Sequence, residues 1–184
     1  MAYDMRNDLQ ETLVSKEEIQ ATVARLGAEI SRDYEGKNPI LITVLKGAFI
    51  FMADLCRAIT VPCTMDFMSV SSYGSGTTTS GTVRIRKDLD VNIEGQHVII
   101  VEDILDSGVT LSNLIELLKT RNPASMRLVT LFDKPERRKA EVAIDYCGMQ
   151  VPDAFIVGYG LDYDEKYRNL PFIGVLKPEV YENK

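Results

Sequence analysis

The segment from Val98 to Thr110, which reads VIIVEDILDSGVT, limits the possible folds more than any other part of the chain. Its first four residues are all apolar, which is typical of a strand covered on both faces in a parallel sheet. Apolar residues then recur at i, i+3, i+4 and i+7 between Leu111 and Leu118, which is helical spacing. The segment therefore predicts a buried strand that is joined to a helix by a short turn.

The turn between these two elements carries groups that suit a phosphate and a metal ion. The N–H groups that open a helix have no acceptor within it and can surround an anion, and Gly108 would let the backbone approach closely. Glu102 and Asp103 follow the apolar residues, at the carboxyl edge where open α/β sheets bind ligands. Their oxygens suit Mg²⁺ that carries a phosphorylated substrate.

A simpler interpretation of these residues stays open. Asp106 could merely cap the helix, and the two acids could merely solvate the end of a strand. Two adjacent acids, a third acid and then Ser-Gly-x-Thr together favour a binding site. The site is neither a Walker loop nor a dinucleotide fingerprint, because neither glycine pattern occurs in the segment.

The composition excludes several classes of protein. A chain of 184 residues suffices for one well-buried α/β domain, so we expect a single domain over 1–184. Its net charge of −6 argues against a surface that binds nucleic acid. No apolar run approaches the roughly 20 residues that span a bilayer, and residues 1–8 lack a signal-peptide core. We expect a cytoplasmic protein with neither a nucleic-acid nor a membrane partner.

Strand and helix patterns alternate along the chain. Ser15-Lys16-Glu17-Glu18 is a capping box, which predicts a helix whose apolar residues recur up to Ile30 and which Gly36-Lys37-Asn38-Pro39 ends. A second helix is predicted at 48–57. Strands are predicted at 40–45, 63–73, 82–86, 126–132 and 155–157, with 82–86 antiparallel to 63–73. This order predicts an α/β fold with a mainly parallel open twisted sheet and helices on both faces.

The segment Val98–Thr110 resembles the phosphoribosyl pyrophosphate signature of type I phosphoribosyltransferases, and nearly the whole chain resembles the hypoxanthine-guanine branch of that family. The resemblance implies a small hood to which the C-terminal part contributes, for recognition of the base, and a flexible hairpin lid at about 72–82. It implies Mg²⁺-dependent transfer of the phosphoribosyl group from phosphoribosyl pyrophosphate to N9 of hypoxanthine or guanine. The products would be IMP or GMP and pyrophosphate, and the family's assembly implies a homodimer or homotetramer.

The resemblance assigns roles in the sugar-phosphate half of the site. Asp106 matches the family's acid beside N7 of the purine and is the candidate general base. Lys46 and Gly47 match a pyrophosphate loop in which the preceding Leu-Lys bond can be cis. The expected phosphate loop is Asp106, Ser107, Gly108, Val109 and Thr110, and the expected lid residues are Ser72 and Tyr73. Relatives often have Thr and Lys where this chain has Ser107 and Val109.

The resemblance also assigns the base-binding half. Lys134 matches the lysine that reads the exocyclic oxygen of a 6-oxopurine. Phe155 would stack on the purine, and the Ile156 backbone would read its edge. Asp162 would bind a second Mg²⁺, and Arg168 would pair with pyrophosphate as a planar bidentate donor. The expected metal ligands are Glu102, Asp103 and Asp162.

Two alternative functions stay open. The same signature serves transferases for adenine, orotate, uracil and xanthine, and Lys134 with the segment 155–163 points away from most of these, with xanthine still open. Folds of this family also serve as regulatory proteins that bind nucleic acid without catalysis. The acidic charge balance and the presence of Asp106, Lys46 and Arg168 disfavour that second reading.

Overall fold

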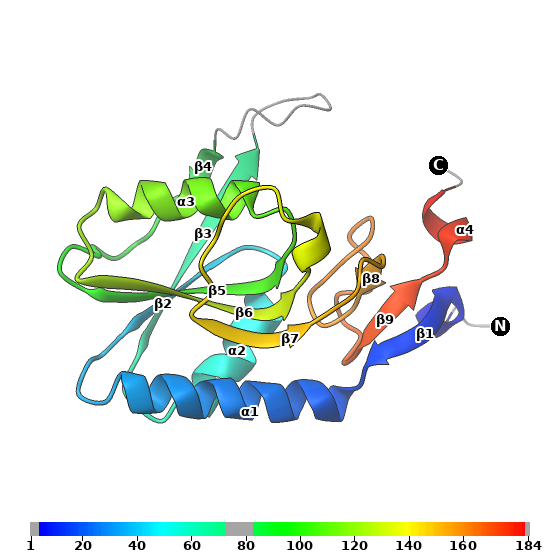
Figure 1. Ribbon diagram of the computed structural model, residues 1–184, viewed down its shortest axis with the longest axis horizontal. Coiled ribbons are helices and arrows are strands. Elements are labelled where there is room, and N and C mark those ends of the chain that lie inside the picture. The colour runs from blue at the N-terminus through cyan, green and yellow to red at the C-terminus, as the bar shows by residue number, and fades with distance from the viewer. Residues whose placement is uncertain (1–3, 73–82, 183–184) are drawn as a thin grey trace.

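A six-stranded sheet forms the centre of the molecule in a computed structural model that describes residues 4–72 and 83–182 (Figure 1). The strand order is β4-β3-β2-β5-β6-β7. Neighbours from β3 to β7 pair in parallel, and β4 pairs antiparallel with β3. The mainly parallel sheet and the antiparallel excursion are thus confirmed. The strands are β2 (Ile40–Val44), β3 (Thr64–Ser72), β4 (Val83–Lys87), β5 (His97–Leu105), β6 (Ser125–Asp133) and β7 (Tyr146–Gln150).

Helices cover both faces of this sheet, as predicted. The helices α1 (Lys16–Asp33) and α2 (Phe49–Ala58) lie on one face and α3 (Val109–Lys119) lies on the other (Figure 1). The capping box at Ser15 is present, because its side chain accepts from the Glu18 amide while the Glu18 carboxylate accepts from the Ser15 amide. Within the described ranges, no helix has both the length and the apolar character needed to cross a membrane.

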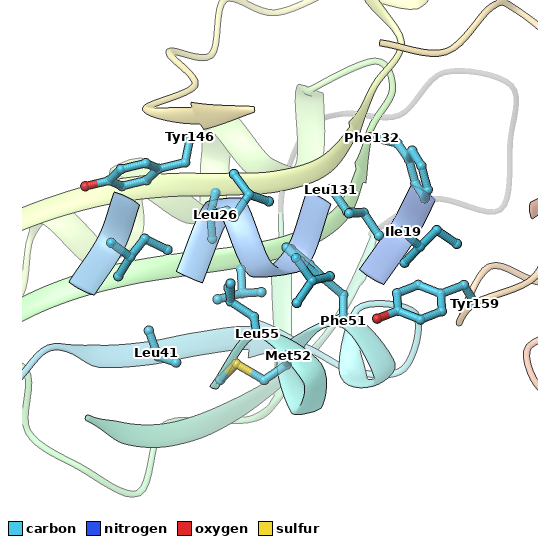
Figure 2. Packing of buried hydrophobic residues seen from close by; sticks show 14 of the residues in the cluster. Ile19, Leu26, Leu41, Phe51, Met52, Leu55, Leu131, Phe132, Tyr146 and Tyr159 are labelled. Atoms are coloured by element: carbon cyan, nitrogen blue, oxygen red, sulfur yellow. The ribbon is translucent and has the colours of Figure 1, made fainter. Parts of the chain in front are cut away.

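The central strand β5 has apolar residues at consecutive positions because both of its faces are buried. Ile99 and Val101 pack in the cluster that contains α1 and α2, whereas Val98 and Ile100 pack in the cluster that contains α3. Figure 2 shows the first cluster, in which side chains of α1 and α2 such as Ile19 and Phe51 lie beside those of β6. Alternate residues of one strand thus anchor helices on opposite sides of the sheet.

The strand β5 is longer than its apolar run. It continues through Glu102 and Asp103 to Leu105 and stays paired with β6, but its pairing with β2 ends at Thr43 and Val101. The two acids were predicted at the end of the strand; they lie within it, beyond the last residue pair that β5 makes with β2. One edge of this part of β5 is therefore free of a strand neighbour, and a loop packs there instead.

A second, three-stranded sheet with the order β1-β9-β8 forms a hood beside the main sheet (Figure 1). Its strands are β1 (Leu9–Val14), β8 (Ile156–Val157) and β9 (Ile173–Leu176). The C-terminal part was predicted to contribute to a hood; β8 and β9 come from that part, and β1 comes from the N-terminal part, which was not predicted. The remaining short elements are the 3-10 helices η1 (Met5–Asp8) and η2 (Pro135–Arg137) and the helix α4 (Pro178–Tyr181).

Candidate active site

Two adjoining cavities lie at the carboxyl end of the main sheet, where open α/β sheets bind ligands. The first cavity is lined by the loop after β2, the end of β5 and the start of α3, and it includes Lys46, Gly47, Glu102, Asp103, Asp106, Ser107, Gly108 and Thr110. The second cavity has a volume of about 580 Å³ and includes Gly47, Asp103, Asp106, Lys134, Arg137, Asp153, Phe155, Ile156, Asp162, Arg168 and Tyr181. Because Gly47, Asp103 and Asp106 line both cavities, the two form one groove.

Most of the predicted site residues therefore meet in one place, although they come from distant parts of the chain. Val109 is the first residue of α3 and lines neither cavity. Ser72 is the last described residue of β3. Tyr73 and the rest of the expected lid lie outside the described residues, so the lid stays a prediction.

The turn at the start of α3 is held from outside by the segment 138–140. The Ser107 carbonyl accepts hydrogen bonds from the amides of Lys139 at 2.9 Å and Ala140 at 3.1 Å. Arg138 Nε donates to the Asp106 carbonyl at 3.1 Å. Gly108 is the N-cap residue with a φ of 76°, and no side chain caps this helix. The alternative in which Asp106 merely caps α3 is therefore wrong, and the helix start opens to the first cavity.

The loop after β2 is held against an acid of β5 by close backbone packing. The Leu45-Lys46 peptide bond is cis. A Cβ atom on Gly47 would lie 2.1 Å from Asp103 Oδ2, so the loop reaches this position only with glycine. Gly160, with a φ of 100°, lies on the other side, where a Cβ atom would lie 2.1 Å from the Gly47 carbonyl oxygen. Lys46 Nζ pairs with Glu165 at 3.1 Å.

Replacement of Gly47 by alanine tests this packing. The added methyl group must displace either Asp103 or the loop, so we expect Gly47→Ala to lower turnover by about ten- to a hundredfold, as small misplacements of a site do. Steady-state kinetics would measure the loss. Gly95→Ala is a control, since its φ of 68° carries strain but its Cβ would meet nothing within 4 Å. Unchanged turnover in Gly47→Ala would contradict the argument.

One carboxylate oxygen of Asp106 is buried without a partner in the part of the chain that the structure describes, although the side chain as a whole is 41% exposed. Its Oδ1 atom is buried and accepts no hydrogen bond from any described residue, and its Oδ2 atom lies 3.7 Å from Arg137 Nη1. Enclosed polar atoms are normally paired in folded proteins. An unpaired carboxylate oxygen where two cavities meet marks the place of a ligand that carries a donor.

Arg168 has a similar orphan atom at the other side of the groove. Its Nε atom is buried without a partner among the described residues. The rest of its guanidinium is fixed, because Nη1 donates to the Gly160 carbonyl at 2.7 Å and Nη2 pairs with Asp162 Oδ1 at 2.9 Å. The arginine is thus held in place and retains a donor for an acceptor that the protein does not supply.

Lys134 is buried in the second cavity, with an exposed fraction of only 4%. Its Nζ atom donates to the Ala154 carbonyl at 2.8 Å and lies 3.9 Å from Asp153 Oδ1. These two contacts leave ammonium donor capacity for a further acceptor. The residue is therefore a fixed cationic donor in a cavity, and the alternative of a solvated surface lysine is wrong.

The charged forms of the two β5 acids, Glu102 and Asp103, are disfavoured by burial and by neighbouring negative charge. Burial, together with the charge of Asp103, raises the pKa of Glu102 well above its usual range. Burial also raises the pKa of Asp103 to about 6, and the charge of Asp162 adds to that rise. A bound cation would offset both effects.

The donor set fits a magnesium ion that arrives with its substrate. Asp103 and Asp162 line the same cavity, whereas Glu102 lines only the first. Across residues 4–72 and 83–182, no three His, Cys, Asp or Glu side chains meet so as to hold an ion by themselves. Mg²⁺ typically takes one or two carboxylates and completes its shell with water and substrate phosphates, so two acids suffice.

Several residues that line the groove were not predicted from the sequence. Arg137 bridges two acids of the second cavity, since its Nε atom pairs with Asp153 at 3.2 Å and its Nη1 atom faces Asp106. Arg138, which was not predicted either, lines neither cavity but pairs with the buried Asp133 behind the groove. Arg137 is the last residue of η2, Arg138 follows it, and Asp153 lies in the loop between β7 and β8. None of the three belongs to a segment with a periodic apolar pattern. Only the density of charge in Lys134-Pro135-Glu136-Arg137-Arg138 could have indicated them.

Comparison with known proteins identifies the family. The phosphoribosyl transferase domain model matches residues 10–164, and the chain belongs to this family. The chain is 56% identical to the hypoxanthine-guanine phosphoribosyltransferase of Bacillus subtilis (strain 168), with 97% of this chain and 99% of that protein covered. It is 51% identical to the protein of the same name from Streptococcus pneumoniae (strain ATCC BAA-255 / R6), with the same coverage. A crystal structure of a hypoxanthine phosphoribosyltransferase from Staphylococcus aureus matches with a TM-score of 0.96 at 51% identity, over 100% of both chains.

Proposed function

We propose that this enzyme is a hypoxanthine-guanine phosphoribosyltransferase, which transfers the phosphoribosyl group from phosphoribosyl pyrophosphate to N9 of hypoxanthine or guanine. The products are IMP or GMP and pyrophosphate, and the reaction is purine salvage. The observation that carries the proposal is the unpaired carboxylate oxygen of Asp106. Asp106 lines both the first cavity, which is open to the start of α3, and the second cavity, which contains the buried Lys134. The names of the relatives in three bacterial species support the same reaction.

The first cavity takes the ribose phosphate in this proposal. The amides at the start of α3 and the hydroxyl groups of Ser107 and Thr110 bind the 5′-phosphate, since the first N–H groups of a helix lack intrahelical acceptors. Lys46, Gly47 and Arg168 hold the pyrophosphate and stabilise the charge that develops as it leaves. Glu102 and Asp103 hold the ribose hydroxyl region.

The second cavity takes the purine. Lys134 Nζ donates to O6, Phe155 stacks on the ring, and the Ile156 backbone reads the edge of the base. A cationic donor favours the oxygen of hypoxanthine or guanine over the amino group of adenine, because a mispaired buried donor is costly. Asp106 accepts a proton from the purine as the new bond to N9 forms.

Asp103 and Asp162 would hold Mg²⁺ together with the substrate, and the ion would neutralise the pyrophosphate charge. The burial that raises the pKa of Asp103 fits a carboxylate that gains a cation when the substrate binds. We place the reaction in the cytoplasm, with a homodimer or homotetramer as the expected assembly.

A release assay tests the proposal directly. The enzyme is given phosphoribosyl pyrophosphate and Mg²⁺ with hypoxanthine, guanine, xanthine, adenine, uracil or orotate, one at a time, and the released pyrophosphate is measured. We expect turnover with hypoxanthine and guanine and its loss when a chelator removes Mg²⁺. Turnover with only another base would overturn the assignment of the base site, and no turnover with any base would overturn the enzyme assignment.

A further inference from the structure

The aromatic ring of Phe155 does not stand alone in the second cavity. The Tyr181 ring stacks on it with the ring centroids 4.7 Å apart and an interplanar angle of 18°. The Tyr163 ring meets it edge-on, at 5.5 Å and 88°. Tyr181 also lines the cavity that contains Lys134. A residue close to the end of the described chain thus reaches the site.

The position of Tyr181 is fixed by two independent attachments. The Lys177 amide donates to the Asp8 carbonyl at 2.9 Å, and Lys177 Nζ donates to the Asn7 carbonyl at 2.8 Å, which ties the start of α4 to η1. The Leu176 amide donates to the Phe155 carbonyl at 2.8 Å. The segment that carries Tyr181 is therefore bonded both to the N-terminal part and to the residue on which Tyr181 stacks.

Phe155 stays partly exposed although Tyr181 stacks on its ring. The residue keeps an exposed fraction of 39%, although Tyr181 covers one face of its ring and Tyr163 meets an edge. A stacked neighbour on one face restricts rotation of the ring, and the exposed remainder of a residue that lines the second cavity is available to a planar ligand. Aromatic pairs prefer offset stacked or edge-to-face geometry, and both types are present around this one ring.

We propose that Tyr181 is a positioning residue for purine binding, which backs the Phe155 ring so that purine, Phe155 and Tyr181 form a three-layer stack. The inference rests on the proposed function, because it takes the purine as the ligand of Phe155. It extends the base site to α4, a helix outside both the phosphoribosyl pyrophosphate signature and the segment that carries Phe155. Tyr181 also packs against the apolar cluster of the hood, as Val180 does, and in a merely structural role it would contribute only that packing.

Kinetics of Tyr181→Ala, Tyr181→Phe and Tyr181→Leu in the full chain test this role. The KM for hypoxanthine and guanine is measured at saturating phosphoribosyl pyrophosphate, and the KM for phosphoribosyl pyrophosphate at saturating purine. We expect alanine and leucine to raise the purine KM by about two- to tenfold, the range of a single stacking contact, with the other KM unchanged. Phenylalanine keeps the ring and should retain the wild-type purine KM.

Val180→Ala is the matched control, since Val180 lies in the same short helix and packs with the hood but lines neither cavity. It should lower the melting temperature without a change in purine KM. A Tyr181→Leu enzyme that behaves like this control would overturn the inference, and so would a purine KM that falls in Tyr181→Ala, because the ring would then compete with the base. A wild-type enzyme that turns over no purine would contradict the proposed function itself.

Discussion

Asp106→Asn is expected to lower turnover by about 10²- to 10⁴-fold, which is the usual contribution of a general base. The substitution keeps the size and shape of the side chain but removes the ability to accept a proton. The Oδ1 atom of Asp106 has no protein partner among the described residues, and Oδ2 has only a long ion pair with Arg137 at 3.7 Å, so the exchange of one oxygen for an amide group should leave the fold unaffected. Steady-state kinetics with hypoxanthine, together with thermal unfolding, would measure both effects.

The split between kinetic constants makes this test sharper. A group that acts only in the transition state lowers kcat and kcat/KM equally, so the KM for phosphoribosyl pyrophosphate should stay at the wild-type value. Asp90→Asn is a suitable control, because the Asp90 side chain is 80% exposed and pairs with Lys87 outside both cavities. Wild-type turnover in Asp106→Asn would rule out Asp106 as the base.

Lys134→Ala is expected to remove most of the preference for 6-oxopurines. A hydrogen bond from a charged donor contributes about 1.5–3 kcal/mol, so kcat/KM for hypoxanthine and guanine should fall by roughly ten- to 150-fold. We expect a smaller fall in kcat/KM for adenine than for hypoxanthine and guanine, because the amino group of adenine cannot accept a hydrogen bond from the Lys134 ammonium. The ratio of kcat/KM between hypoxanthine and adenine is therefore the quantity to measure.

Two further variants distinguish a loss of base recognition by Lys134 from a general loss of activity. Lys119→Ala removes a lysine whose side chain is 56% exposed at the end of α3, and it should leave the ratio unchanged. Lys134→Gln keeps a neutral donor and should give an intermediate ratio. If Lys134→Ala has the selectivity of the wild type, Lys134 does not read the base.

Most of the main sheet could be predicted from the sequence because its elements, other than β7, carry local patterns. The apolar run that starts at Val98 and the capping box at Ser15 act over a few residues, and both predictions are confirmed. The strand β1 was missed because half of its residues, LQETLV, are exposed and because it pairs, within the described residues, with β9 from far along the chain. The strand β7 was missed because Gly148 and polar residues weaken its pattern.

In the candidate site, too, the parts that depend on local sequence patterns could be predicted, and the contacts between distant segments could not. The turn from Asp106 to Thr110 follows from strand and helix periods that lie next to each other in sequence. The contacts of Arg137 with Asp106 and Asp153 depend on how η2 packs against other loops, and no spacing in the chain encodes that packing. The stack of Tyr181 on Phe155 likewise depends on the position of the hood.

The origin of the hood in both ends of the described chain has a consequence for synthesis on the ribosome. The strand β1 pairs with β9, and Val14 lies opposite Ile173, so β1 must wait for its partner until nearly the whole chain has been made. The strands that carry the phosphate turn, from β2 to β6, are complete much earlier. Contacts between residues that are distant in sequence also form more slowly, since more chain entropy is lost on closure. Under the proposed function, the elements around the sugar-phosphate cavity are thus synthesised well before the hood that carries Phe155 and Ile156 of the base site.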